Sequence, residues 1–102
     1  MIISGGVNIY PQEIENCLEM HPKVYDAAVI GVPDEEMGES VKAVVQPTDG
    51  AEPGTTLAEE LRASLRTRIA HYKVPRAFDF VTELPRTPTG KLAKNTLRIQ
   101  HR

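Results

Sequence analysis

Apolar residues recur along this chain with two periods, a longer one typical of helices and a shorter one typical of strands. The longer period predicts two amphipathic helices. Apolar side chains three and four positions apart follow Pro11, which suits the first turn of a helix, and Pro22 should end that helix. Leucines recur at every fourth position within residues 56–69, where Thr56 and Glu59 have the spacing of a capping box. Each helix is therefore expected to bury one apolar stripe.

The shorter period, together with runs of β-branched residues, predicts three strands. Residues 24–32 are almost continuously apolar, which indicates a largely buried strand. Residues 41–46 alternate between apolar and polar side chains, and residues 78–84 begin with two phenylalanines on one side. We expect the first two of these strands to be antiparallel neighbours.

The two ends of the chain predict smaller elements. Residues 1–3 are apolar before Ser4-Gly5-Gly6 interrupts them, which indicates a short N-terminal strand, and residues 91–99 have the pattern of a short terminal helix. The prolines and the glycine of residues 85–90 exclude regular structure there. The expected fold class is α+β: a small two-layer domain with a sheet of about three strands, helices packed on it and the short N-terminal strand.

Length and composition favour a single globular domain. Of the 102 residues, 40% are hydrophobic and 25% are charged, a balance typical of folded domains. No apolar run approaches the roughly 20 residues of a membrane-spanning helix, and the N-terminus lacks the features of a secretory signal. Cys17 is the only cysteine and cannot form an internal disulfide, so we expect a cytoplasmic location.

The formal net charge of −2 conceals an uneven distribution. Residues 1–50 hold nine acidic and two basic residues, whereas residues 51–102 hold five acidic and ten basic residues. The basic half is suited to an anionic ligand. Charge alone favours the simpler interpretation, in which mixed surface charge serves solubility.

The segment from Pro85 to Lys91 is the most informative motif for chemistry. Prolines stiffen it, Gly90 permits an unusual φ, and Lys91 follows with a compact positive charge on a long side chain. Such a cation can stabilise negative charge that develops on a phosphoryl or carboxyl group. A solvated loop lysine is the alternative that the residues themselves leave open. The segment is not a phosphate-binding P-loop, because Pro85 and Leu92 occupy positions that the P-loop motif requires to be glycine and serine or threonine.

Other common sites are not indicated. The two adjacent glycines lack the spacing of a dinucleotide-binding fingerprint, and the three histidines and one cysteine lack the spacing of metal ligands. Phe78 to Val81 superficially has the aromatic strand of an RNA-recognition fold but not its glycines and basic flanks, so core packing is favoured. We therefore predict no metal site and no nucleic-acid partner.

Four segments, in order along nearly the whole chain, resemble the C-terminal domain of the AMP-forming acyl-CoA synthetases of the fatty-acid–CoA ligase type, in the adenylate-forming superfamily. The matching segments are Ile2 to Glu15, Ala28 to Glu39, Tyr72 to Pro75, and Leu84 to Lys91.

The resemblance implies that residues 1–102 are a mobile lid, cut near a hinge, on a larger N-terminal adenylation domain. In such enzymes one pose of the lid forms an acyl-adenylate from a carboxylic acid and ATP, and a second pose admits coenzyme A to form the thioester. ATP, Mg²⁺ and CoA are implied for the full-length enzyme, and none of them should bind tightly to this domain alone. The isolated domain is therefore expected to have no ligase activity.

The resemblance also assigns roles to residues. Lys91 corresponds to the catalytic lysine of the adenylation pose, in a substrate loop that includes Thr89 and Gly90. It would contact the substrate carboxylate and the phosphates of ATP, where a positioned cation lowers the barrier to attack on the α-phosphate.

A second set of residues corresponds to the CoA side. Gly5, with Gly6 next to it, matches the glycine beside the pantetheine tunnel, where a side chain would obstruct the thiol. Tyr72 and Arg76 match positions that meet the CoA nucleotide, by stacking on adenine and by pairing with phosphate. Val74 matches a third such position but offers only backbone or packing contacts.

Three other interpretations remain open from the sequence. The first is an adenylation domain that hands its acyl group to a carrier protein instead of CoA, because an acidic carrier would also favour basic residues. The second is a stand-alone binding module that uses the basic half of the chain. The third is a structural protein–protein module, in which Lys91 and Gly5 would be replaceable without loss.

Overall fold

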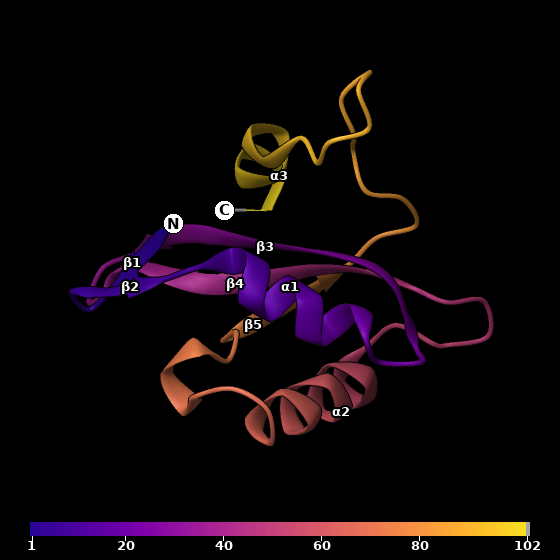
Figure 1. Ribbon diagram of the computed structural model, residues 1–102, viewed down its shortest axis with the longest axis horizontal. Coiled ribbons are helices and arrows are strands. Elements are labelled where there is room, and N and C mark those ends of the chain that lie inside the picture. Colours follow the sequence, from indigo (N-terminus) through magenta and orange to yellow (C-terminus); the bar gives the residue numbers. More distant parts are fainter. Residues whose placement is uncertain (102) are drawn as a thin grey trace.

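The computed structural model of the protein describes residues 1–101, which form one mixed sheet with helices on both faces (Figure 1). The elements, in chain order, are β1 (Ile2–Ser4), β2 (Val7–Ile9), α1 (Pro11–Glu19), β3 (Val24–Asp34), β4 (Gly38–Pro47), α2 (Thr55–Arg66), a 3₁₀ turn η1 (His71–Lys73), β5 (Ala77–Phe80) and α3 (Lys94–His101). None of the helices in this part of the chain is long and apolar enough to cross a membrane.

The sheet is built around β4. Four strands follow one another in the order β2-β1-β4-β3 with antiparallel pairing, and β5 pairs with β4 in parallel. The β3–β4 pairing runs from Val24 opposite Pro47 to Asp34 opposite Gly38, which confirms the predicted antiparallel neighbours. β1 meets β4 only where Ser4 lies opposite Gly38.

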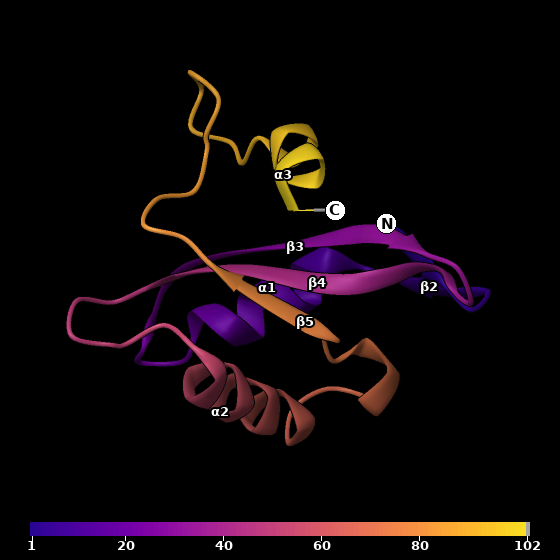
Figure 2. The same cartoon turned by 180° about the vertical axis from the view of Figure 1, so that it is seen from behind.

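Helices α1 and α2 cover one face of the sheet, and α3 covers the other (Figures 1 and 2). The side chains of β3 alternate between two buried clusters: Ala27 and Val29 pack on the α1 and α2 side, whereas Ala28 and Ile30 pack with Leu97 of α3. A strand that is covered on both faces needs apolar residues at successive positions, and this explains the continuous apolar run of the sequence.

The structure confirms the α+β class and differs from the expected sheet. It has five strands instead of about three plus a short N-terminal strand. Gly5 and Gly6 have φ values of +57° and +80°, so the N-terminal segment turns back on itself and forms two strands. The sheet also lies between two helical layers, because α3 packs on the face that the predicted two-layer arrangement left open.

Three element boundaries also differ from the expectation. The capping box predicted at Thr56 and Glu59 is wrong, because α2 begins at Thr55 and its N-cap residue, Gly54, forms no side-chain capping bond. β5 ends at Phe80 instead of residue 84, and α3 begins at Lys94 instead of residue 91. Side-chain type suggested a longer β5 and a longer α3 than the backbone hydrogen bonds form, whereas α2 begins before the predicted cap.

Asp79 of β5 holds the C-terminal end of α3 against the sheet. Its Oδ2 lies 2.6 Å from His101 Nδ1 and 2.8 Å from Lys42 Nζ, and Lys42 also donates to the His101 carbonyl at 2.7 Å. Partial burial of Asp79 opposes ionisation, but the hydrogen bonds from Lys42 and His101 outweigh burial and hold the pKa of Asp79 below its usual value. The ionised carboxylate therefore stabilises the docked helix.

This lowered pKa predicts a pH-dependent difference between the wild-type chain and Asp79→Asn. A carboxyl whose pKa is lower in the folded state adds stability above its unfolded value of 3.8, and this stability is lost as the pH falls through the lower folded value. We expect wild type to be the more stable protein at pH 5, and the difference to disappear on acidification. Urea unfolding of both proteins between about pH 5 and pH 2 measures this difference in the free energy of unfolding. A difference that is constant across this range would contradict the lowered pKa of Asp79.

Candidate functional site

Residues 85–93, here called the lysine loop, form a hairpin-shaped excursion between the sheet and α3 (Figure 1). Arg86 and Leu92 face each other in an antiparallel bridge, and the Ala93 N–H donates to the Pro85 carbonyl at 2.9 Å. The base of the loop is therefore closed by backbone contacts across its two arms.

The tip of the lysine loop is a tight turn that begins at Thr87. The Thr87 N–H donates to the Lys91 carbonyl at 2.7 Å, and the Gly90 N–H donates to the Thr87 carbonyl at 2.8 Å. The hydroxyls of Thr87 and Thr89 lie 3.0 Å apart. Gly90 has a φ of +87°, a value that residues with a Cβ rarely adopt, so the turn depends on glycine at this position.

Lys91 lies exposed on the second arm of this turn. Its backbone is fixed, because its N–H also donates to Thr87 Oγ1 at 3.2 Å. Within residues 1–101 its ammonium group has neither a hydrogen-bond nor an ion-pair partner. A cation without an intramolecular partner, on a backbone of defined shape, is available to an anionic group of a ligand.

Arg86, the other cation of the lysine loop, is engaged within the domain. Its guanidinium donates to the Gly90 carbonyl at 2.8 Å and pairs with the carboxylate of Asp26 on β3. Arg86 therefore ties the loop to the sheet, and among residues 1–101 Lys91 is the cation of the loop whose side chain has no partner.

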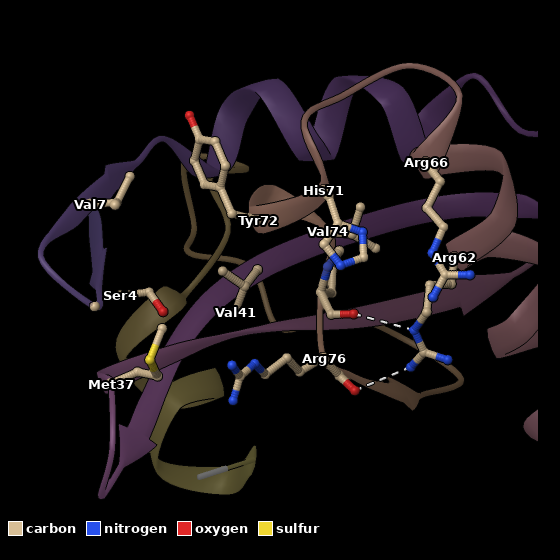
Figure 3. A pocket seen from close by; sticks show the side chains of 12 residues that line it. Ser4, Val7, Met37, Val41, Arg62, Arg66, His71, Tyr72, Val74 and Arg76 are labelled. Carbon is tan, nitrogen blue, oxygen red and sulfur yellow. Dashed lines mark hydrogen bonds between the residues drawn. The ribbon is translucent and has the colours of Figure 1, made fainter.

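A second candidate region, here called the basic pocket, lies beside the β1–β2 turn and has a volume of about 360 Å³ (Figure 3). It combines an apolar floor with several cationic side chains. Its lining residues are Ser4, Gly5, Val7, Met37, Val41, Arg62, Arg66, His71, Tyr72, Val74, Pro75 and Arg76.

Gly5 and Gly6 differ in their relation to this pocket. A Cβ on Gly5 would lie 2.6 Å from Met37 Cε, and the Gly5 N–H donates to the Met37 carbonyl at 2.9 Å. Gly6 does not line the pocket, and no described atom lies within 4 Å of a Cβ built on it. A side chain at Gly5 would therefore alter the pocket, whereas one at Gly6 would strain only the backbone.

Tyr72, Val74 and Arg76 reach the pocket from η1 and the segment that leads into β5. The Tyr72 ring is 55% exposed and stands at the rim near Val7 (Figure 3). Val74 is buried and contributes apolar surface. The exposed guanidinium of Arg76 lies 3.7 Å from a carboxylate oxygen of Asp34.

Asp34 provides a negative charge beside Arg76 at this end of the pocket. Its Oδ1 accepts hydrogen bonds from the N–H groups of Met37 and Glu36, both at 3.0 Å. These bonds, with a smaller contribution from Arg76, lower the pKa of Asp34. The ionised Asp34 orients Arg76 through a single long contact, so most of the guanidinium donors of Arg76 remain available to a ligand.

Three basic pocket residues were not among the sequence-predicted site residues. Arg62 donates to the carbonyls of Pro75 and Arg76, at 3.4 and 3.1 Å, and thereby holds the segment that carries Arg76 (Figure 3). Arg66 and His71 are exposed at the rim. Their only signal in the sequence is the basic excess of the second half of the chain, which does not identify individual residues.

The structure brings Gly5, Tyr72 and Arg76 together in the basic pocket, and it keeps Lys91 apart from them. In both views the β1–β2 turn and the lysine loop lie at opposite ends of the sheet, and the loop projects on the α3 side (Figures 1 and 2). Within residues 1–101, no group of three or more His, Cys, Asp or Glu side chains is placed to hold a metal ion.

Sequence comparison identifies the family of the chain. The model of the AMP-binding enzyme C-terminal domain matches residues 13–91. The chain is 52% identical over 99 residues to 3-[(3aS,4S,7aS)-7a-methyl-1,5-dioxo-octahydro-1H-inden-4-yl]propanoyl:CoA ligase of Rhodococcus jostii (strain RHA1), covering 96% of the chain and 18% of that protein. It is 50% identical over 98 residues to a mitochondrial medium-chain acyl-CoA ligase of Danio rerio, covering 96% of the chain and 16% of that protein.

Structure comparison also finds an acyl-CoA synthetase. The crystal structure of the Brucella canis acyl-CoA synthetase superposes with a TM-score of 0.93 at 43% identity, over 97% of this chain and 18% of that one. The chain thus spans less than one fifth of the length of each of these three proteins.

Proposed function

Because the chain belongs to the AMP-binding enzyme C-terminal domain family, we propose that it is the mobile C-terminal domain of an ATP-dependent, AMP-forming acyl-CoA ligase. The observation that carries this proposal is the separation of the lysine loop from the basic pocket on one small domain. A reacting group that meets Lys91 does not at the same time meet Gly5. The domain therefore serves two half-reactions, one with each end, and turns between them.

In the first half-reaction Lys91 acts on ATP and a carboxylic acid. The substrate carboxylate attacks the α-phosphorus of ATP, an acyl-adenylate forms, and pyrophosphate leaves. Negative charge gathers on the phosphoryl oxygens during this step, and the Lys91 ammonium stabilises it. The exposure of Lys91 and its lack of a partner among residues 1–101 support this role. Thr89 and Gly90 shape the turn that presents Lys91.

In the second half-reaction the basic pocket receives CoA. The thiol attacks the acyl carbon of the adenylate and loses its proton, and AMP leaves. Gly5 keeps the passage for the pantetheine arm open, because it lines the basic pocket without a side chain. Tyr72 at the rim offers a face for adenine, and Arg76 offers donors to phosphate.

We propose that the remaining parts of the reaction centre lie in an N-terminal domain. These parts are the acid pocket, most of the ATP site and the Mg²⁺ site, since the described residues provide no cluster of metal ligands. The chain alone is then expected to show no ligase activity. Turnover of a fatty acid, ATP and CoA by the chain alone would contradict this assignment.

Arg76→Ala tests the CoA assignment. We expect the KM for CoA to rise roughly tenfold, because a charge-assisted hydrogen bond to phosphate is lost, while acyl-adenylate formation is unchanged. Arg68→Ala is the matched control, because Arg68 is also an exposed arginine, does not line the pocket, and within residues 1–101 its guanidinium hydrogen-bonds only to Met20 Sδ. Steady-state kinetics with CoA as the varied substrate, in the longer protein that carries this domain, measures the effect. An equal change in both variants would contradict a specific contact.

A carrier protein is the alternative acceptor. The exposed Arg66 and His71 extend the basic surface around the rim, and an acidic carrier would be attracted to the same surface. Competition between CoA and a phosphopantetheinylated carrier for the pre-formed acyl-adenylate separates the two acceptors. Preferential transfer to CoA supports the ligase, whereas preferential transfer to the carrier supports the alternative.

A further inference from the structure

Glu15 of α1 is a buried carboxylate that the proposed reaction does not use. It is 5% exposed, and its Oε2 accepts hydrogen bonds from the Val29 N–H at 2.8 Å and from Lys94 Nζ at 2.5 Å. Lys94 Nζ also donates to the Val29 carbonyl at 2.8 Å. Three elements, α1, β3 and α3, therefore meet at one partly buried ion pair.

The position of this ion pair on the sheet explains why it forms. β3 is at the edge of the sheet, and its outward N–H and carbonyl groups have no neighbouring strand. At Val29 the carboxylate of Glu15 accepts from the outward N–H, and the ammonium of Lys94 donates to the outward carbonyl. The pair therefore satisfies both outward backbone groups of the buried Val29 and joins α1 on one face to α3 on the other.

The same contact fixes one end of the lysine loop. The loop begins after Leu84, which is buried in the cluster beneath α3, and it leads directly into Lys94, the first residue of that helix. Leu92 packs against the apolar cluster beneath α3. Lys94 follows Lys91 by three residues, so the ion pair is the polar side-chain anchor nearest to Lys91 on the C-terminal side. Arg86 with Asp26 anchors only the opposite arm, and Lys42 with His101 holds only the far end of α3.

We propose that Lys94 and Glu15 are positioning residues for Lys91, which set the place of the lysine loop by holding the first turn of α3 across the edge of β3. Neither residue contacts substrate. The inference rests on the proposed role of Lys91 in adenylation, and it adds two residues, 79 positions apart in sequence, on which that role depends.

Hydrogen exchange on this chain tests the structural part without any activity measurement. The variant is the double substitution Glu15→Gln/Lys94→Met, because removal of Lys94 alone would leave an uncompensated buried carboxylate and could unfold the domain. We expect the amides of Thr87 and Ala93, which are hydrogen-bonded within the loop, to exchange about 10-fold faster or more, while β4 and α2 keep their protection. Unchanged protection of both amides would overturn the proposal.

The matched control removes a second lysine–glutamate pair that does not touch the loop. Lys23 Nζ lies 2.8 Å from Glu60 Oε2 and joins the start of β3 to α2. Lys23→Met/Glu60→Gln should leave the exchange of Thr87 and Ala93 at the wild-type rate. Equal acceleration in both double variants would indicate general destabilisation and would also overturn the proposal.

The two half-reactions test the functional part in the longer protein that carries this domain. In Glu15→Gln/Lys94→Met we expect acyl-adenylate formation to fall about 10- to 100-fold, because a displaced catalytic group loses its orientation, while thioester formation from supplied acyl-adenylate is kept. A merely structural role would lower both rates together. Lys94→Arg, which keeps a donor cation, should recover most of the adenylation rate.

Comparison with Lys91→Ala separates this inference from the proposed function. Loss of adenylation in Lys91→Ala with no loss in Glu15→Gln/Lys94→Met would refute the positioning role and keep the role of Lys91. Full adenylation in Lys91→Ala would refute the proposed function itself, and the exchange experiment would then still decide whether the ion pair holds the loop.

Discussion

Replacement of Lys91 by alanine is expected to lower the rate of acyl-adenylate formation about 100- to 1,000-fold, the cost of removing one group that stabilises charge in a transition state. The variant should fold normally, because Lys91 is exposed and its side chain has no partner among residues 1–101. Thioester formation from supplied acyl-adenylate should be kept, because the basic pocket lies at the other end of the sheet. Pyrophosphate release and thioester formation, measured separately by rapid quench, give the two rates.

The lysine loop provides a matched control for this substitution. Arg86→Ala removes a cation from the same loop, but one that is engaged with Asp26 and the Gly90 carbonyl. Lys91→Arg keeps the charge with a different shape and should recover only part of the rate. If Lys91→Ala loses no more adenylation activity than a substitution of an exposed lysine elsewhere, Lys91 is a solvated loop residue and its proposed role is wrong.

Gly5→Leu is expected to impair thioester formation, the half-reaction that Lys91→Ala leaves intact. The added side chain would enter the basic pocket beside Met37, so thioester formation should fall about 100-fold while acyl-adenylate formation is kept. The φ of +57° at Gly5 adds backbone strain that is separate from obstruction. Stopped-flow mixing of the enzyme-bound acyl-adenylate with CoA measures the affected step.

Two further variants separate obstruction from strain. Gly50→Leu introduces the same side chain at a glycine with φ of +87° and no described atom within 4 Å of the new Cβ, so it reports the cost of strain alone. Gly5→Leu/Met37→Ala removes the side chain that the Cβ would strike. If the loss of thioester formation disappears in this double variant, the cause is local packing against Met37; if it persists, the cause is a blocked passage.

The elements of this fold that depend on side-chain period were predictable from the sequence. The leucine stripe of α2 is buried as expected, with Leu61 fully buried and Leu57 and Leu65 nearly so. The apolar run of β3 and the alternation of β4 likewise identified strands and their antiparallel pairing. These patterns are local, because each residue's side of a helix or strand is fixed by its spacing from its neighbours.

Contacts between distant parts of the chain were not predictable in the same way. Glu15 and Lys94 are individually ordinary charged residues, and only the docking of α1 and α3 at the edge of β3 brings them together. The parallel pairing of β5 with β4 and the approach of Arg66 to the pocket also depend on tertiary packing. The resemblance assigned Lys91 to one half-reaction and Gly5 and Arg76 to the other, and these roles stay predictions, whereas the location of the two sets at different ends of the domain required the structure.

We propose that one small domain carries two separate sites for two successive steps. The most direct test measures both half-reactions side by side in Lys91→Ala and Gly5→Leu. We expect opposite losses: adenylation in the first variant and thioester formation in the second. Loss of the same step in both variants, or of both steps in each, would contradict it.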